Sequence, residues 1–170
     1  MRASIAATMR GPNLKRGRNG DGADVSALDR EIIGFLQADG RRPYTQIAAA
    51  IGLSEAAIRA RVNRLVSAGI LQIVGVADPT KLGYQQALVG VRCEPGRRTE
   101  VAEALARMPE VDYVVLTAGR YDVLIETVVE DNDGLLEFLD VRLPSVGGIR
   151  ETEAFPYLRL VKQTYQFGTR

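Results

Sequence analysis

The chain has 170 residues, no histidine and one cysteine, and its formal net charge is +1. No apolar run approaches the roughly 20 residues that a membrane-spanning helix needs, and a lone cysteine excludes an intramolecular disulfide. Without histidine the chain lacks the commonest general base and a principal zinc ligand. We therefore expect no membrane span, no metal, no cofactor and no catalytic residue, hence not an enzyme. A lone thiol suits a reducing, cytoplasmic location.

The charges are unevenly distributed along the chain. Residues 1–83 carry 12 Lys and Arg against 7 Asp and Glu, whereas residues 84–170 carry 10 against 14. A basic front half and an acidic back half suggest two modules with different partners. Only the front half suits a polyanion.

Residues 1–25 are rich in Gly, Asn, Arg and Lys and show no apolar periodicity, which predicts a disordered basic tail. Order is expected from Ser26, because Ser26 and Asp29 match a capping box in which Asp replaces the usual Glu. Apolar residues at helical spacing then predict a first helix that ends near Gly40. Thr45 is the expected N-cap of a second, short helix.

The third predicted helix, Ser54–Gly69, has an N-cap residue at its start and a glycine at its end. Its apolar residues Ile58, Val62 and Leu65 form one stripe. Three arginines lie off that stripe, at positions 59, 61 and 64. They suit either a helix that enters a DNA groove or an ordinary solvated face. The order of helices, with a three-residue turn before the third, is that of a helix-turn-helix.

The β-branched residues of 70–77 predict an extended strand after the third helix. We place the helix-turn-helix domain at 26–73, a linker at 74–84 and a second domain at 85–167.

The second domain reads strand, helix, strand, strand, helix, strand, which is the ferredoxin-like βαββαβ plan. Cys93 is in register with Val89 and Val91 on the first strand, so we expect a buried thiol. The second helix should bury Leu135, Leu136, Leu139 and Leu143. The last strand should pass Thr152 and resume at 158–161 after Pro156, which implies an edge strand or a bulge.

RNA-binding modules share this plan, but they carry aromatic residues on central strands. The acidic balance here and the absence of aromatics on the first strand disfavour RNA binding.

Gly119-Arg120 separates the two middle strands, which are therefore expected to form a hairpin. As a turn, Gly119 supplies unusual dihedrals and Asp122 bonds to nearby backbone. As a site, Gly119 lets a ligand approach the backbone, and Asp122 meets an ammonium group. Spacing alone favours the turn.

Taken together, several motifs resemble the Lrp/AsnC (leucine-responsive) family of transcriptional regulators, over about residues 26–165. They are Leu28-Asp-Arg-Glu-Ile, Gly40-Arg-Arg-Pro-Tyr-Thr, Gly52-Leu-Ser54, Ile58-Arg-Ala-Arg-Val-Asn-Arg-Leu65, Gly69-Ile-Leu, Asp78-Pro-Thr-Lys-Leu-Gly83, Gly119-Arg-Tyr-Asp122 and Thr152-Glu153. The chain departs from the family pattern at Ala154, where the family often has Thr, and in its long basic tail.

The resemblance implies an α+β protein with an N-terminal three-helix (winged) helix-turn-helix domain and a C-terminal ferredoxin-like domain. It implies a sequence-specific DNA-binding transcriptional regulator, modulated by an amino acid or related small molecule held between subunits. Its partners would be duplex DNA, the effector and further copies of the chain, as a dimer or possibly an octamer. The alternative is a small-molecule-binding oligomeric module with a vestigial DNA-binding half.

Residues expected to contact DNA are Tyr44, Thr45, Ser54, Glu55, Ala57, Arg59, Arg61 and Arg64. Residues that the resemblance places near the effector are Gly119, Arg120, Tyr121, Asp122 and Thr152.

Overall fold

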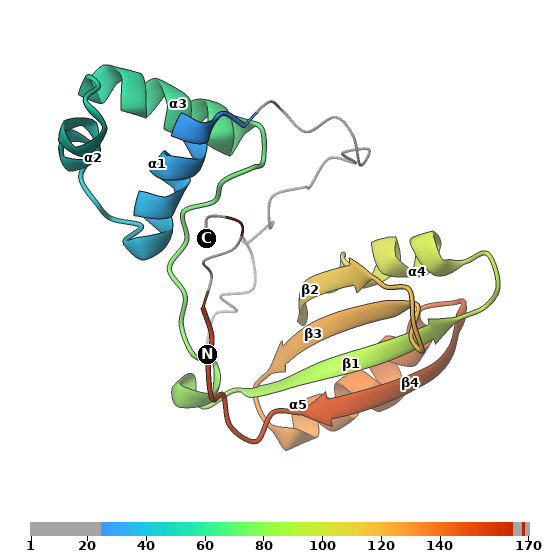
Figure 1. The fold of residues 1–170 in the computed structure, drawn as a ribbon. Helices are drawn as coiled ribbons and strands as arrows, with labels where there is room; N and C mark the ends of the chain where they lie inside the picture. The colour runs from blue at the N-terminus through green and yellow to red at the C-terminus, as the bar shows by residue number, and fades with distance from the viewer. Residues whose placement is uncertain (1–24, 165–167, 169–170) are drawn as a thin grey trace, which may run out of the picture. The chain divides into compact units, whose positions relative to one another are not determined.

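The computed structural model describes residues 25–164 and Gly168, so the expected tail falls almost entirely outside the described residues. The chain divides into two compact units: the first comprises the chain up to Val76 together with the residues from Gln163 on, and the second spans Ala77–Lys162 (Figure 1). The expected linker at 74–84 includes this division and stays a prediction.

The first unit contains three helices, α1 (Ala27–Ala38), α2 (Tyr44–Ile51) and α3 (Glu55–Ser67). The apolar stripes predicted from helical spacing meet in one core, so the helix-turn-helix arrangement is confirmed. Its buried members are Ile32, Leu36, Ile47, Ala48, Ile58, Val62, Leu65 and Leu71.

Two of the three N-caps predicted for the first unit are present. The Ser26 hydroxyl accepts a bond from the Asp29 N–H and the Asp29 carboxylate accepts one from the Ser26 N–H, which confirms the capping box. Ser54 caps α3 by accepting from the Ala57 N–H at 3.2 Å. The prediction for Thr45 is wrong, because Pro43 is the N-cap of α2 and Thr45 lies in its first turn. Proline, with its fixed φ and no N–H, starts this helix without a side-chain cap.

The strand expected at 70–77 does not form. Leu71 joins the helical core, but the side chains of Ile73, Val74 and Val76 are exposed. A β-branched segment needs a partner strand for its backbone groups, and residues 25–76 provide none. A short 3₁₀ turn, η1 (Thr80–Leu82), follows.

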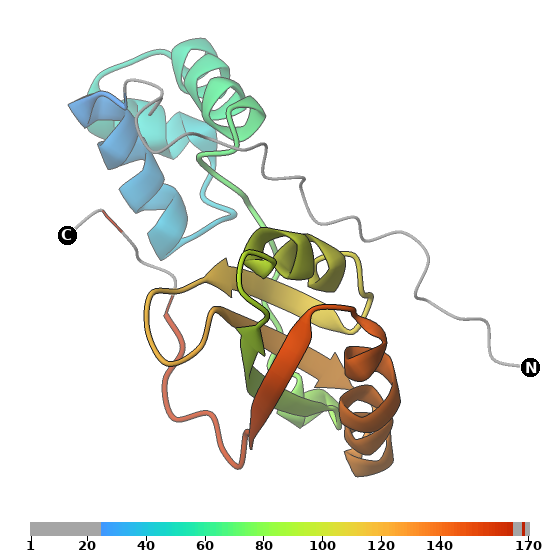
Figure 2. The ribbon, with the colours of Figure 1, turned by 90° about the vertical axis from the view of Figure 1, so that its right-hand side faces the viewer.

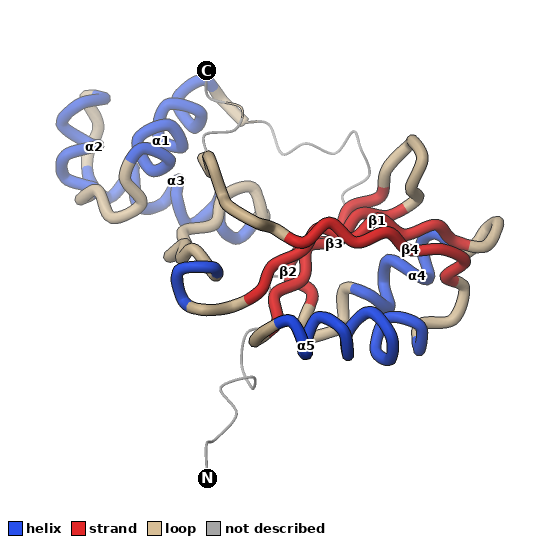
Figure 3. The backbone as a smooth tube through the Cα atoms, turned by 90° about the horizontal axis from the view of Figure 1, so that it is seen from below, coloured by secondary structure: helices blue, strands red, loops and turns tan. Residues whose placement is uncertain are grey.

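The second unit is a four-stranded sheet covered on one face by its helices, as Figure 3 shows. The strands lie in the order β2-β3-β1-β4, and all neighbours are antiparallel. This order confirms the ferredoxin-like plan. The elements are β1 (Gln85–Cys93), α4 (Arg98–Leu105), β2 (Val111–Leu116), β3 (Val123–Val129), α5 (Asn132–Glu137) and β4 (Ile149–Pro156).

The core of this unit lies between the sheet and the helices. Ala87, Val89, Val91 and Cys93 of β1 are all buried in it, as their alternation predicted. Burial raises the pKa of the Cys93 thiol, with a smaller contribution from the charge of Asp122. The free Cys93 is therefore a small buried hydrophobe.

The predicted apolar face of the second helix was wrong at one position. Leu136 is 58% exposed, whereas Phe138, which we did not predict, is 1% exposed. The helix continues as a π-helical turn, η2 (Phe138–Arg142), and a 3₁₀ turn, η3 (Leu143–Ser145). A π-turn inserts an extra residue, so the buried side chain after Phe138 is Leu143, five residues later.

β4 is an edge strand beside β1, as Pro156 implied (Figure 2). The expected resumption at 158–161 is wrong, because Leu158 is 99% exposed and no strand follows Pro156 up to residue 164. The Tyr157 N–H donates to the Gln86 carbonyl, and the chain then leaves the sheet.

Candidate functional sites

A buried carboxylate joins α3 to α1. Asp29 is 1% exposed and accepts bonds from Arg64 at 2.6 Å and from Arg61 at 3.1 Å. Burial raises the pKa of this carboxyl, but the bonds from Arg64, Ser26 and Arg61 outweigh it and hold the pKa well below its usual range. Two of the three arginines of α3 thus pair with α1.

Arg59 lies on another side of α3. Its guanidinium bonds Glu55 one turn earlier at 2.5 Å and lies 5.2 Å from the centroid of the Tyr44 ring. The Arg59 side chain remains 58% exposed. The structure therefore brings three predicted DNA-contact residues together: Tyr44 from α2, and Glu55 and Arg59 from α3.

A shallow depression runs along this side of α3. It is lined by Glu55, Ala56, Arg59, Ala60 and Asn63. Ala56, Ala60 and Asn63 were not among the residues predicted to contact DNA. Their helical spacing places them on the side of α3 opposite the buried stripe, and this spacing could have identified them. Because Ala56 and Ala60 are small, a ligand can approach the backbone of α3 closely.

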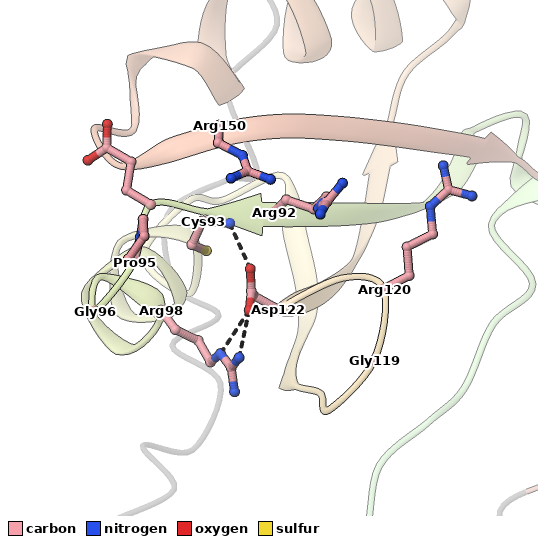
Figure 4. A pocket seen from close by; sticks show the side chains of 10 residues that line it. Arg92, Cys93, Pro95, Gly96, Arg98, Gly119, Arg120, Asp122 and Arg150 are labelled. Atoms are coloured by element: carbon pink, nitrogen blue, oxygen red, sulfur yellow. Dashed lines mark hydrogen bonds and ion pairs between the residues drawn. The ribbon is translucent and has the colours of Figure 1, made fainter.

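The second unit contains a cavity of about 550 Å³ (Figure 4). Three separate segments form it: the end of β1 with the turn into α4, the β2–β3 loop, and the start of β4. The lining residues are Arg92, Cys93, Glu94, Pro95, Gly96, Arg98, Gly119, Arg120, Asp122 and Arg150.

Asp122 is held firmly at one side of this cavity. Its carboxylate accepts bonds from the Cys93 N–H at 2.9 Å and from Arg98 at 2.6 Å, as Figure 4 shows. These two interactions hold the pKa of Asp122 below its ordinary value. The loop is closed by Thr117, whose N–H donates to the Asp122 carbonyl and whose hydroxyl donates to the Tyr121 carbonyl.

Arg150 enters the cavity from an irregularity in β4. Arg92 pairs with Glu151 across the sheet, but Cys93 pairs with Ile149, which leaves Arg150 as the extra residue of a bulge. Bulges re-aim side chains and are common beside functional sites. Figure 4 shows the Arg150 guanidinium extending toward the end of β1.

The cavity contains Gly119, Arg120 and Asp122, but Tyr121 and Thr152 do not line it. The Tyr121 ring covers Gly90, where a Cβ atom would lie 2.7 Å from the ring, and its edge meets Phe155. Thr152 is exposed on β4 opposite Val91. The arginines at 92, 98 and 150 were not predicted, because no local signal joins three segments that far apart in sequence.

Within the described residues, no three His, Cys, Asp or Glu side chains are grouped so that they could hold a metal ion. No helix in the same part of the chain is long and apolar enough to cross a membrane.

A capped three-helix unit followed by a separate βαββαβ unit with its own cavity defines a class of protein, the two-module regulators built on a helix-turn-helix. Comparison with known proteins narrows the class. The AsnC-type helix-turn-helix domain matches residues 26–66, and the Lrp/AsnC ligand binding domain matches residues 86–167.

Among curated relatives, the HTH-type transcriptional regulator PH0140 of Pyrococcus horikoshii is 36% identical over 132 residues, covering 76% of this chain and 84% of the relative. The HTH-type transcriptional regulator FL11 of the same organism is 33% identical over 142 residues, covering 82% and 93%. Among solved structures, the transcriptional regulator NMB0573 of Neisseria meningitidis in complex with L-Met has a TM-score of 0.69 at 24% identity, covering 82% and 93%.

The chain belongs to the Lrp/AsnC family of transcriptional regulators.

Proposed function

We propose that this protein is a sequence-specific DNA-binding transcriptional regulator whose α3 helix enters the major groove. The observation that carries the proposal is the exposed side of α3, where Arg59 stands beside a strip of small residues and Asn63. Arginine reads guanine and asparagine reads adenine through paired hydrogen bonds in that groove. Ser54 and Ala57 at the start of α3, and Tyr44 and Thr45 at the start of α2, are proposed to face the DNA backbone.

Arg61 and Arg64 have a different proposed role from Arg59. Their side chains are 36% and 45% exposed, and each is bonded to Asp29. We assign them to phosphate contacts beside the groove, where a fixed cation is sufficient and no base needs to be read.

The test is binding to a DNA site selected from a random library by the full chain. Arg59→Ala is expected to weaken binding to that site by about 1–3 kcal/mol and to relax the preference at one base position. Arg107→Ala is the matched control, because Arg107 is an exposed arginine of the second unit. Unchanged affinity and preference after Arg59→Ala would contradict the assignment of Arg59. Failure to select any sequence would favour the vestigial alternative.

Salt dependence provides an independent measurement. Binding through several phosphate contacts must weaken steeply as salt rises, because each neutralised phosphate releases counterions. Affinity that is nearly constant between 50 and 200 mM salt, roughly the range over which such complexes lose most of their affinity, would count against the proposal.

We further propose that the cavity of the second unit binds an amino acid or related small molecule that modulates DNA binding. The NMB0573 regulator, in complex with L-Met, shares this fold. The cavity includes Gly119, Arg120 and Asp122, which the family resemblance placed near an effector. Tyr121 would act beside the cavity, by filling the space over Gly90. Thr152 would approach it only if a second subunit completes the site.

The open sheet face, which is the face without helices, is the proposed surface for self-association. The strand register places Tyr113, Glu126, Leu88 and Phe155 in one row across it. The side chains of Tyr113 and Phe155 are 53% and 42% exposed. Pairing two such faces would bury these side chains and make a two-fold dimer. Such a dimer predicts inverted-repeat DNA sites.

A further inference from the structure

We propose that the cavity of the second unit takes a small ligand with a net negative charge, such as an acidic amino acid, in preference to an apolar amino acid with no net charge. This inference rests on the proposed function, in which the cavity is the effector site. It concerns the chemical class of the effector.

The side chains that line the cavity are mainly cationic. Four arginines (Arg92, Arg98, Arg120 and Arg150) face two carboxylates (Glu94 and Asp122). The half of the chain that contains them has an acidic balance, so the cavity reverses the local sign of charge. Arginines concentrated in a concave site attract anions.

Both carboxylates already have partners. Asp122 accepts from Arg98 and from the Cys93 N–H, and Glu94 lies 3.3 Å from Arg97, which also pairs with Glu100 at 2.6 Å. An ammonium group that approached Asp122 would have to displace Arg98 or share the carboxylate with it. The cavity therefore offers little attraction for a cationic group.

The arginines, by contrast, have bonding capacity left. Within the described residues Arg150 has no carboxylate partner, and Arg120 reaches Glu153 only at 3.5 Å, beyond a strong hydrogen bond. Arg92 pairs with Glu151 at 3.0 Å through one nitrogen. Each guanidinium presents up to five N–H donors in a fork that matches a carboxylate or phosphate.

The geometry of β4 supports a specific role for Arg150. In a regular strand, the residue that follows Arg92 would pair with Arg150, and Arg150 would lie in the ladder. The bulge removes Arg150 from the ladder, and its side chain lines the cavity near Arg92. Arg92 already has the carboxylate of Glu151, whereas Arg150 has none within the described residues, so an anion in the cavity would offset the charge of Arg150.

The cavity also lies at the start of α4. Gly96 and Arg98 line it, and no side chain caps this helix. The unpaired N–H groups of a first turn favour negative charge. This contribution adds to that of the arginines and has the same sign.

The experiment is a calorimetric titration of the full chain with L-aspartate, L-glutamate, inorganic phosphate, L-methionine and L-leucine at constant ionic strength. We expect at least one of the three ligands with a net negative charge, aspartate, glutamate or phosphate, to bind at least tenfold more tightly than either apolar amino acid. Tight phosphate binding without aspartate or glutamate binding would identify a phosphorylated ligand within the same class.

Arg150→Gln should weaken the binding of the negatively charged ligand at least tenfold. The matched control Arg107→Gln removes an exposed charge of the same unit, outside the cavity, and should leave binding unchanged. A thermal melt of each variant without ligand verifies folding. Equal losses in both variants would mean that general charge, and not the site, attracts the anion, which would overturn the proposal.

Tighter binding of methionine or leucine than of every negatively charged ligand would overturn this inference and leave the proposed effector function intact. No binding of any of the five ligands would overturn both proposals about the cavity. Selection of a specific DNA sequence by the same preparation would still support the regulator.

Discussion

Asp29 makes two structural connections with one side chain. As the third residue of α1 it completes the capping box with Ser26, and as a buried anion it binds Arg61 and Arg64 of α3. A buried carboxylate is costly unless it is fully hydrogen-bonded, and Asp29 is. The capping box therefore fixes the start of α1 and also orients the proposed recognition helix.

Removing the charge of Asp29 should destabilise the first unit. Asp29→Asn is expected to cost about 3 kcal/mol, the low end for breaking a buried ion pair, because both arginines are partly exposed. Urea denaturation at neutral pH measures this loss. Glu31→Gln, an exposed neutralisation on the same helix, is the control and should cost less than about 0.5 kcal/mol. Equal losses would contradict a specific role for Asp29.

The wild type and Asp29→Asn should also differ in how their stability changes at acidic pH. The pKa of Asp29 is lowered in the folded state, so its contribution is complete above the unfolded value of about 3.9 and is lost as pH falls below it. Wild type should therefore lose more stability than Asp29→Asn between pH 7 and pH 3. If both lose the same amount, other carboxylates account for the acid sensitivity.

At the scale of elements, sequence patterns predicted what local rules determine. Helical spacing identified the stripe of Ile58, Val62 and Leu65, and strand alternation identified the buried face of β1. Patterns failed where tertiary context decides. Pro43, and not Thr45, is the N-cap of α2, and residues 70–77 form no strand because residues 25–76 contain no partner strand.

The residues of the cavity, too, could be predicted from the sequence only where they form a local motif. Gly119-Arg-Tyr-Asp122 was identifiable as one local motif, but Arg98 and Arg150 come from other elements. A bulge brings Arg150 in, and bulges leave no reliable mark in a single sequence. The charge of the cavity therefore became visible only from the fold.

Because of the π-helical turn after α5, the core of the second unit contains Phe138 and not Leu136, and this can be tested by substitution. Phe138→Ala should destabilise the second unit by about 3–5 kcal/mol, since a fully buried aromatic side chain is removed. Leu136→Ala, two residues earlier and mostly exposed, should cost less than about 1 kcal/mol. Thermal melts of both variants measure the difference. Comparable losses would indicate a regular α-helix in solution, with Leu136 buried.

At the scale of the whole molecule, the two units have complementary limitations. In the proposed complex one three-helix unit would contact only one half of an inverted repeat, and a sheet with one open face exposes apolar side chains to water. Pairing the open sheet faces would resolve both, because it covers Phe155 and Tyr113 and brings two copies of α3 to one DNA site. DNA affinity should therefore depend on assembly through the sheet.

Phe155→Lys tests this dependence, because it places a charge on the edge strand of the proposed interface. Sedimentation should show the wild type at twice the 18.5 kDa of one chain or more, and the variant nearer one chain. Its affinity for the selected inverted repeat should fall at least tenfold, while its affinity for a single half-site stays unchanged. Leu158→Lys is the matched control, since Leu158 is fully exposed beyond the end of β4, and both properties should persist. A Phe155→Lys protein that remains a dimer and binds DNA normally would mean that self-association uses another surface.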